Sequence, residues 1–433
     1  MKLLQVQDAE AAAALLLAVV RDWERRCEWL PLSEAAGRVC AEDLAADAFV
    51  PDFNRSTVDG FAVVSADTAA AGEGVPVVLE VAGQVEMGAS ADFAIRPGAC
   101  AGVATGAMLP KGADAAVMIE HTEAVGAGRV ALYQSAAPGE NIVRRGDDMK
   151  PGDVCVPRGT RLGAGQVGAL AALGILDVPV FQPLRLLLIS TGDELVPCSE
   201  TPSPGQVRDI NTAAIAALAQ KNGYAVTGRL LVPDDRAALL DAVRSGLPEN
   251  DVICVSGGSS QGEKDRTREI LDEVTQGGVF THGIAVKPGK PTILGYDGAS
   301  ATVVAGLPGH PAAAITVFDM LFCRLARAYM HQPDPLPVRA FLGVNVPGAG
   351  GRSKCQAVRL TVEAKGDAPR MPEAKGGAAG TAAPNGSGTR ICATPVYGTS
   401  GMISTLAGAD GYFIMNRNAE GLPAGSTVEV FLL

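Results

Sequence analysis

The chain has 433 residues, of which 47% are hydrophobic and 19% charged, and its formal net charge is −11. This composition is typical of a packed globular protein with two to four domains, and the acidic balance disfavours non-specific binding to nucleic acid or to an anionic membrane surface. Apolar stretches are interrupted by charge well short of a membrane span, and the first residues carry no cleavage signal for secretion. We therefore expect a cytoplasmic protein with no nucleic-acid or membrane partner.

The nine cysteines are scattered singly, without a C-x-x-C pair. Disulfide scaffolds and zinc ribbons need paired or regularly spaced thiols, so this spacing disfavours both. We expect buried, reduced cysteines. An acidic chain can bind an anionic ligand only where it gathers basic side chains and backbone N–H groups locally.

The first half of the chain predicts two domains. Helical spacing over residues 8–26 and a helix opened by Ser33 are followed by short β-like segments separated by turn residues. After these segments a strand and a helix return. We expect a discontinuous, elongated linker domain of residues 1–47 plus 149–182, with a β-rich domain of residues 48–148 inserted into it.

The second half predicts two more domains. Over residues 183–332, apolar strands, loops and helices alternate at a spacing typical of a doubly wound parallel α/β domain with helices on both faces. Residues 333–433 are strand-like again and predict a C-terminal small β-barrel. A Gly/Ala/Pro-rich stretch, 365–388, interrupts this barrel as a flexible surface insertion. The expected fold class is therefore multidomain, α/β plus β.

Three loops of the predicted α/β domain are rich in glycine or serine. They are STGDE at 190–194, SGGSSQGEKD at 256–265 and GLPGHP at 306–311. In an open parallel sheet, ligands bind where loops leave the carboxyl ends of the strands. Glycines let backbone N–H groups approach oxygens, and helix N-termini supply positive potential. Together the loops predict a site for an anionic ligand.

Carboxylates occupy the same region: Asp193, Glu194, Asp209, Asp234, Asp235, Glu263 and Asp265. Helix capping is the favoured interpretation for Asp209, Asp234 and Asp235. Glu194 follows a glycine turn at a strand end, which capping does not explain. A phosphate-binding loop with carboxylates is electrostatically reasonable when a divalent cation lies between them. Mg2+, held by one or two carboxylates plus ligand phosphates, fits this pattern.

Basic residues lie in two other segments. Lys287 and Lys290 flank Pro288 and Gly289, a stiff loop that aims two ammonium groups near one place, although solvated surface lysines fit equally. The segment NIVRRGDD puts two arginines beside two aspartates, which also fits a surface salt-bridge cluster. His310 has no acidic or nucleophilic neighbour in sequence, so a catalytic role is not favoured. Nucleophile elbows, zincin helices and Walker loops are absent from the sequence.

Nine segments occur in one order along the chain: PDFNRSTVDGFAV, ATGAMLPKGADAAVMIEH, GENIVRRGDD, STGDEL, GQVRDIN, SGGSSQGEKD, VKPGKP, GLPGHP and TSGMIS. Together they resemble the molybdopterin molybdenumtransferase family, which includes bacterial MoeA and the E domain of gephyrin. The resemblance runs from about residue 5 to the C-terminus.

This resemblance implies Mg2+-dependent insertion of molybdate into adenylylated molybdopterin, which yields molybdenum cofactor and AMP. It also implies a homodimer whose site lies where the third domain of one subunit meets the second domain of the other. A separate molybdopterin adenylyltransferase would supply the substrate. Two alternatives stay open: an adenylyltransferase or pyrophosphatase-like enzyme on the same α/β domain, and a non-catalytic, gephyrin-like scaffold.

The resemblance also implies roles for individual residues. Glu194 and Asp265 would position Mg2+, and Lys287 and Lys290 would neutralise phosphate or molybdate oxygens. The other positions with implied catalytic roles are Asp59, Thr105 and Asp148. The positions implied in ligand binding are Ser190, Thr191, Gly192, Asp209, Asn211, Asp235, Ser256, Gly257, Gly258, Ser259, Gly262, Pro308, Gly309, His310, Pro311 and Ser400.

The chain departs from the commoner family pattern in few places. Ser259 and Gln261 stand where many members have apolar residues. Arg266 replaces a frequent Tyr, and His310 stands where Asn is often found. These differences concern ligand contacts and the choice between molybdate and tungstate rather than the reaction class.

Overall fold

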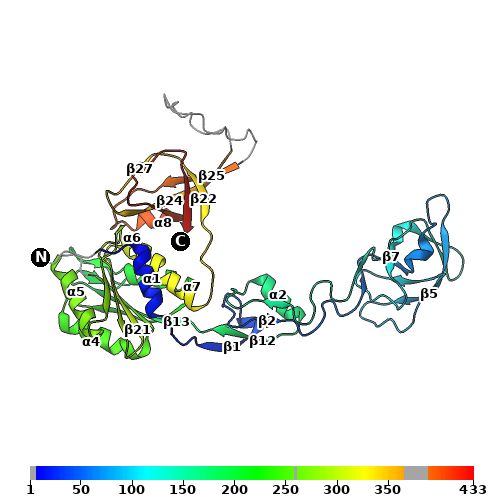
Figure 1. Cartoon of the computed structure of the whole chain (residues 1–433), viewed down its shortest axis with the longest axis horizontal. Helices are drawn as coiled ribbons and strands as arrows, with labels where there is room; N and C mark the ends of the chain where they lie inside the picture. Colours follow the sequence, from blue (N-terminus) through cyan, green and yellow to red (C-terminus); the bar gives the residue numbers. More distant parts are fainter. Residues whose placement is uncertain (1–5, 258–260, 365–388) are drawn as a thin grey trace, which may run out of the picture. The chain divides into compact units, whose positions relative to one another are not determined.

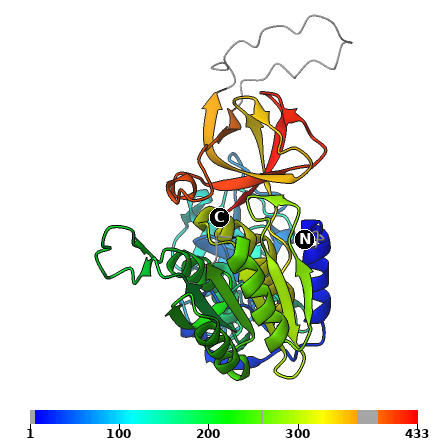
Figure 2. The same cartoon turned by 90° about the vertical axis from the view of Figure 1, so that its left-hand side faces the viewer.

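The computed structural model describes residues 6–257, 261–364 and 389–433. The chain divides into two compact units, residues 1–26 with 181–433, and residues 27–180. Figure 1 shows the secondary structure of both units, and Figure 2 shows it after a turn of 90°.

The unit of residues 27–180 contains a six-stranded sheet in the order β7-β4-β6-β5-β9-β8. Leu79 and Val85 of β5 are buried while Val78, Glu80 and Gln84 are exposed, because one face of the sheet covers a core and the other faces solvent. The elements of the sheet and the short helices beside them are β4 (Gly60–Val63), η2 (Ser65–Thr68), β5 (Val77–Val85), β6 (Ala99–Val103), β7 (Ala115–Met118), η3 (Ile119–His121), β8 (Thr122–Ala124) and β9 (Arg129–Leu132).

The same unit holds a second apolar core, in which Leu32, Val156, Leu170 and Val180 are buried together. Its strands form two-stranded pairs, β1 with β12 and β2 with β11, while β3 pairs with β10. The bounds are β1 (Cys27–Pro31), η1 (Leu32–Glu34), β2 (Leu44–Ala45), β3 (Arg55–Ser56), β10 (Ile142–Val143), β11 (Val154–Val156), α2 (Ala164–Ala172) and β12 (Asp177–Phe181).

The other unit contains the α/β sheet, in the order β16-β13-β17-β21-β20-β18. The first four strands are parallel, and β20 runs antiparallel to both of its neighbours. Strand β21 is buried along its whole length because helices cover both faces. The strands and the short elements between them are β13 (Leu184–Thr191), β14 (Leu195–Val196), β15 (Val207–Arg208), β16 (Tyr224–Val232), η4 (Leu247–Glu249), β17 (Val252–Gly257), β18 (Val279–His282), β20 (Ile293–Asp297) and β21 (Thr302–Leu307).

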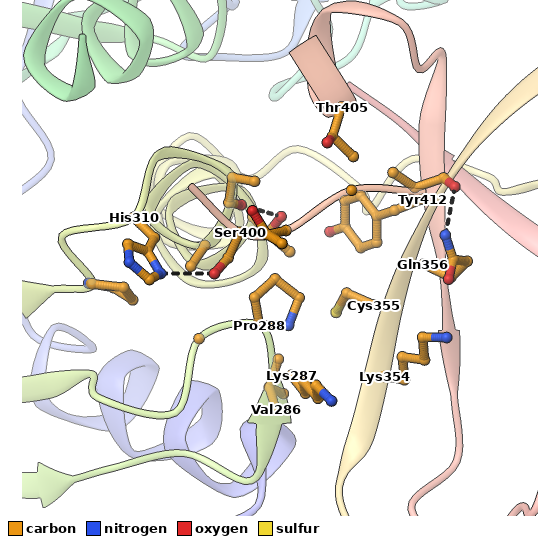
Figure 3. A pocket seen from close by; sticks show the side chains of 18 of the residues that line it. Val286, Lys287, Pro288, His310, Lys354, Cys355, Gln356, Ser400, Thr405 and Tyr412 are labelled. Carbon is orange, nitrogen blue, oxygen red and sulfur yellow. Dashed lines mark hydrogen bonds between the residues drawn. The ribbon is translucent and has the colours of Figure 1, made fainter. Parts of the chain in front are cut away.

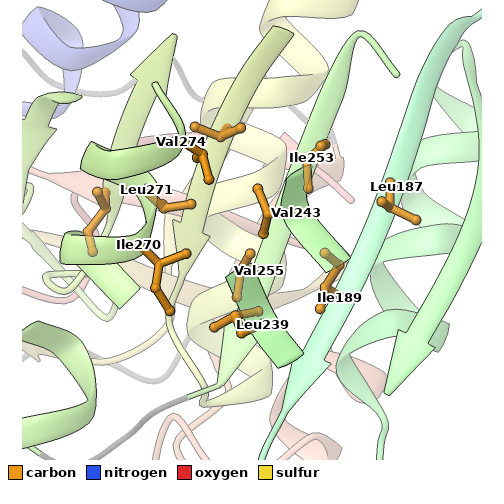
Figure 4. Packing of buried hydrophobic residues seen from close by; sticks show 11 residues of the cluster. Leu187, Ile189, Leu239, Val243, Ile253, Val255, Ile270, Leu271 and Val274 are labelled. Atoms are coloured by element: carbon orange, nitrogen blue, oxygen red, sulfur yellow. The ribbon is translucent and has the colours of Figure 1, made fainter. Parts of the chain in front are cut away.

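Helices α4 (Arg236–Gly246) and α5 (Gln261–Val274) pack on one face of this sheet, where Figure 4 shows side chains such as Leu239 and Ile270 against Ile189 and Val255. Neighbouring residues of a strand point to opposite faces, so the buried Leu186 and Leu188 face the other side. Helices α3 (Asn211–Lys221) and α6 (Pro311–Phe318) cover that side. The predicted α/β class, with helices on both faces, is confirmed.

Helix α1 (Ala9–Val19) differs from the expectation that placed it in the linker domain. It packs against η5 (Asp319–Cys323) and α7 (Arg324–Tyr329), beside which it is drawn in Figure 1. Its small apolar face, with Ala12, Ala13 and Leu16 buried, allows this close packing, and Glu10 pairs with Arg324 at 2.7 Å. The other predicted domain boundaries stay a prediction.

The C-terminal part closes into a barrel, because β24 pairs with both β25 and β26 and completes the ring β24-β25-β22-β28-β26. Leu342, Val358, Phe413 and Val430 fill its core. The predicted insertion 365–388 lies outside the described residues. The bounds are β22 (Val338–Leu342), β23 (Val346–Pro347), β24 (Ser353–Ala364), β25 (Thr389–Pro395), α8 (Ser404–Ala407), β26 (Gly411–Met415), β27 (Gly421–Leu422) and β28 (Thr427–Leu432).

A short strand, β19 (Val286–Lys287), joins the α/β domain to this barrel. It pairs in parallel with the start of β24, with Lys287 opposite Lys354.

All nine cysteines are free thiols, and Cys27 and Cys198 are exposed rather than buried as expected. Across the described ranges, the helices are all too short or too polar to cross a membrane.

Candidate functional site

The three predicted loops leave the same edge of the α/β sheet. Thr191 at the end of β13 pairs with Gly257 at the end of β17, and Ser256 pairs with Leu307 at the end of β21. This register puts the residues that follow each strand next to one another at the carboxyl edge, where ligands bind in such sheets.

A cavity of about 290 Å³ lies at this edge. Nine of the residues predicted to bind a ligand line it: Thr191, Glu194, Asp209, Asn211, Ser256, Gly257, Gly309, His310 and Pro311. The structure therefore brings together most of the predicted positions from the three loops and from the start of α3.

Asp209 is buried and its carboxylate is fully engaged. Ser190 Oγ donates to Oδ1 at 2.9 Å, Thr212 Oγ1 donates to Oδ2 at 2.5 Å, and the Thr212 backbone N–H donates to Oδ1 at 3.3 Å. Asp209 thus caps the first turn of α3, which confirms the capping interpretation. Its contacts hold the loop that carries Asn211.

Asn211 keeps one polar atom free. Its Nδ2 donates to Ser256 Oγ at 2.7 Å and to the backbone oxygen of Gly309 at 2.8 Å. Its buried Oδ1 has no hydrogen-bond partner. A buried acceptor without a partner costs free energy, so this oxygen suits a ligand N–H group or a cation.

Glu194 has an exposed carboxylate that lies over Gly192. A Cβ atom on Gly192 would lie 2.7 Å from Glu194 Oε2, and Gly192 has a φ of +156°. The positive φ favours glycine at this position, whereas the contact is with the end of an exposed side chain that can move aside. The carboxylate of Glu194 is exposed and is therefore available to a ligand. Asp235, by contrast, caps α4 by accepting from the Ala238 N–H at 2.8 Å, as the capping interpretation predicted.

Two other acidic residues, Asp193 and Asp234, form hydrogen bonds that connect neighbouring loops. The backbone N–H of Asp234 donates to Asp193 Oδ1 at 3.0 Å, and Arg266 Nη1 lies 2.9 Å from Asp234 Oδ1. Arg266, a departure from the family pattern, thereby joins the start of α5 to the loop after β16.

Part of the predicted site cannot be placed. Gly258 and Ser259 lie outside the described residues, and so do the side-chain surroundings of Gly262 and Asp265 in the first turns of α5. Within the described part of the chain, no group of three or more His, Cys, Asp and Glu side chains is placed to hold a metal ion.

A larger cavity, of about 630 Å³, lies between the α/β domain and the barrel (Figure 3). Four cationic side chains line it: Lys287, Lys290, Arg352 and Lys354. Pro308, Gly309, His310 and Ser400 line it as well. The structure thus brings both predicted lysines to one cavity.

Arg352 and Lys354 were missed by sequence reasoning, because a basic pair at the start of a strand resembles an exposed strand end. The pairing of β19 with β24 is what places Lys354 opposite Lys287. Burial and the Lys287 ammonium lower the pKa of Lys354. The cationic side chains of the cavity therefore disfavour one another's charge, and a bound anion would offset this effect.

Cys355 also lines the larger cavity, and its thiol is buried. Burial raises the pKa of Cys355 to about 12. The group is thus a neutral thiol near pH 7 and a poor metal ligand there.

The predicted residues of the unit 27–180 are partly brought together. The Thr105 backbone N–H donates to Asp59 Oδ1 at 2.7 Å, and both residues are exposed. Asp148 is exposed too. In the neighbouring RRGDD segment, Arg145 lies 3.1 Å from Asp52 and 3.9 Å from the Phe49 ring centroid, which agrees with the salt-bridge interpretation for that arginine.

Three family models match the chain in order. They are the MoeA N-terminal region (domain I and II) over residues 4–174, a probable molybdopterin binding domain over 187–327, and the MoeA C-terminal region (domain IV) over 385–433.

Similar proteins come from archaea and bacteria. A putative molybdopterin biosynthesis protein of Methanocaldococcus jannaschii is 30% identical over 441 residues, which cover 100% of this chain and 98% of the relative. A molybdopterin molybdenumtransferase of Haemophilus influenzae is 35% identical, over 75% of this chain and 79% of its own. The solved molybdopterin biosynthesis MoeA protein of Pyrococcus horikoshii has a TM-score of 0.81 and 26% identity, and the match covers 99% of this chain and 100% of that one.

Proposed function

The chain belongs to the MoeA family, and on this premise we propose that it is a molybdopterin molybdenumtransferase of molybdenum cofactor biosynthesis. The proposed reaction is the Mg2+-dependent insertion of molybdate into adenylylated molybdopterin, with release of AMP. Relatives from Haemophilus influenzae and Bacillus subtilis, 35% and 30% identical, bear the name of this activity.

The observation that carries the proposal is the larger cavity and its four cationic side chains. Molybdate is a dianion whose four oxygens all accept hydrogen bonds. Because Lys287 and Lys354 lie opposite each other on paired strands, their charges repel in the absence of an anion. A bound oxyanion offsets this repulsion, which supports molybdate as the occupant.

The smaller cavity supports binding of the adenylylated pterin. Its walls combine strand ends, the N-terminus of α6 and the free acceptor Asn211 Oδ1. Helix N-termini attract phosphate, and an amide oxygen can accept from a pterin N–H. Gly309 and His310 line both cavities, so the two proposed substrates would bind side by side.

The described oxygens of the smaller cavity fit Mg2+ in part. Mg2+ is usually bound through one or two carboxylates together with ligand phosphates. The exposed carboxylate of Glu194 is a ligand of this kind and lines the smaller cavity. We propose that it holds the ion together with Asp265, whose role stays a sequence prediction. When bound, Mg2+ supplies neutralisation of the pyrophosphate charge.

The side chains of the larger cavity would orient molybdate toward the pterin. Lys287 and Lys290 neutralise its oxygens while water or a molybdate oxygen attacks the phosphorus of the pyrophosphate, the P–O bond breaks and AMP leaves. The two dithiolene thiols of the pterin would then bind molybdenum: two Mo–S bonds form, one Mo–O bond breaks, and the displaced oxygen leaves as water with the two thiol protons. Because Cys355 stays protonated, it does not compete for molybdenum.

We also propose a cytoplasmic homodimer in which Asp59, Thr105 and Asp148 of one subunit complete the site of the other. The hydrogen bond between Asp59 and Thr105 supports a joint role for these two residues. The nine free thiols are compatible with a reducing compartment. A separate adenylyltransferase would supply the substrate.

The proposal is tested by AMP release under anaerobic conditions, with purified protein, adenylylated molybdopterin and Mg2+, with and without molybdate. We expect AMP only when both ions are present. AMP release at the same rate with and without molybdate would favour the adenylyltransferase or pyrophosphatase-like alternative. No AMP release under either condition would favour a scaffold.

A further inference from the structure

Among the described residues, His310 and Gly309 line both the larger and the smaller cavity. His310 is the N-cap residue of α6, yet its side chain makes no capping hydrogen bond. The backbone around it is held by Asn211 Nδ2, which donates to the Gly309 oxygen at 2.8 Å. The imidazole is therefore an exposed side chain that the helix itself does not use.

The imidazole is bonded to the barrel. His310 Nδ1 lies 2.7 Å from Ser400 Oγ (Figure 3). The Ala312 backbone N–H donates to the backbone carbonyl oxygen of Ser400 at 3.1 Å. Two hydrogen bonds therefore connect Ser400 to the start of α6. On the adjacent residue, a Cβ atom at Gly401 would lie 4.0 Å from His310 Cδ2. Ser400 lines the larger cavity with the four cationic side chains.

The direction of the hydrogen bond between His310 and Ser400 decides what Ser400 can offer a ligand. A serine hydroxyl has one proton to donate and two lone pairs. If Nδ1 accepts, the Ser400 proton is used and only lone pairs face the cavity, which repel an oxyanion. If Nδ1 carries the proton and donates, the Ser400 proton is free to donate to an oxyanion. An oxyanion bound in the cavity would favour the second arrangement.

We propose that His310 is a positioning residue: its Nδ1–H donates to Ser400 Oγ and thereby turns the Ser400 hydroxyl proton toward the oxyanion in the larger cavity. This inference rests on the proposed function for the identity of the oxyanion. An Asn side chain at this position should substitute for His310, because an Asn Nδ2–H reaches about the place of His Nδ1–H and donates in the same way.

The test compares His310→Ala, Ser400→Ala, the double variant and His310→Asn by their KM for molybdate and for adenylylated molybdopterin. Ser400→Ala should raise the molybdate KM about tenfold, the loss of roughly one hydrogen bond to a charged group. His310→Ala should raise it by a smaller but measurable factor, because the Ser400 hydroxyl keeps its proton and loses only its orientation. The double variant should match Ser400→Ala, because His310 acts through Ser400. His310→Asn should restore most of the affinity, and the pterin KM should stay near the wild-type value throughout.

Calorimetric titration with molybdate alone measures the same step without turnover, and the exposed His121 serves as the control position for a histidine-to-alanine change. If the wild type binds molybdate but shows no molybdate-dependent AMP release, the proposed function fails and the positioning role can still hold. Additive effects in the double variant, a rise of the pterin KM alone, no binding by the wild type, or wild-type binding by His310→Ala would each overturn the inference. If His310→Ala does not fold, Ser400→Ala and His310→Asn decide.

Discussion

The ammonium group of Lys354 lies where two effects disfavour its charge. Burial removes it from water, and Lys287 lies opposite it on the paired strand. Both effects lower the pKa of Lys354, so this lysine loses its proton at a lower pH than an ordinary lysine. An oxyanion in the cavity reverses the balance, because it favours the charged form.

This lowered pKa predicts a pH dependence of molybdate binding. As the pH rises through the lowered pKa of Lys354, a positive charge is lost and the affinity should fall. In Lys287→Met one cause of the shift is removed, so the fall should begin at a higher pH, although the affinity near neutrality is weaker. Calorimetric titrations between about pH 7 and 10 measure this. A fall that begins at the same or a lower pH in the variant would contradict the electrostatic role of Lys287.

A second prediction at this scale concerns Gly192, whose backbone φ of +156° favours glycine. Gly192→Ala should cost about 1–3 kcal/mol of unfolding free energy because of backbone strain, and should also weaken Mg2+-dependent turnover. Gly298, where an added Cβ would meet nothing within 4 Å, is the matched control. Urea denaturation of both alanine variants measures the difference, and equal stabilities would contradict the prediction.

The roles of single residues could be predicted where they depend only on neighbours in the sequence. The caps made by Asp209 and Asp235 follow from the preference of helix N-termini for aspartate, and the structure confirms them. Arg352 and Lys354 were not predictable, since their place in the larger cavity depends on strand pairing between segments 67 residues apart in the sequence.

At the scale of elements, the pairing of β19 with β24 assembles the cationic cavity. The Ser353 backbone N–H donates to the Ala285 oxygen at 3.0 Å at the start of this pairing. The alternation of strands and helices was enough to predict the α/β domain. The antiparallel strand β20 and the docking of α1 on α7 were not predicted, because both depend on tertiary packing rather than on local pattern.

Removing the Ser353 N–H should therefore weaken the pairing of β19 with β24, which places Lys354 in the larger cavity. Ser353→Pro lacks this donor and should raise the Kd for molybdate about tenfold, whereas Ser353→Ala keeps the backbone bond and should bind as the wild type does. Calorimetric titration of both variants gives the comparison. Equal affinities would show that the pairing does not position Lys354.

At the scale of the whole molecule, the predicted site residues are divided between two compact units. The proposed homodimer would bring residues of the unit 27–180 of one subunit to the cavities of the other. The segments that resemble the family lie in both units, which is why the sequence predicted site residues in each.

A shared site predicts complementation between inactive subunits. Asp59→Asn and Lys287→Met should each abolish most of the turnover alone. Mixed and re-equilibrated in equal amounts, they should recover about a quarter of wild-type activity, since half of the dimers are mixed and each has one intact site. AMP release measures the recovery. No recovery, in mixtures shown to exchange subunits, would place each site within one chain.

The central claim is that this chain inserts molybdate into the adenylylated pterin. The most direct measurement is the ratio of pterin-bound molybdenum to AMP released, determined by elemental mass spectrometry and chromatography after one anaerobic incubation. We predict equal amounts of both products for the wild type, and a loss of both together in a variant with Lys287→Met and Lys354→Met. AMP formed without pterin-bound molybdenum would contradict the claim.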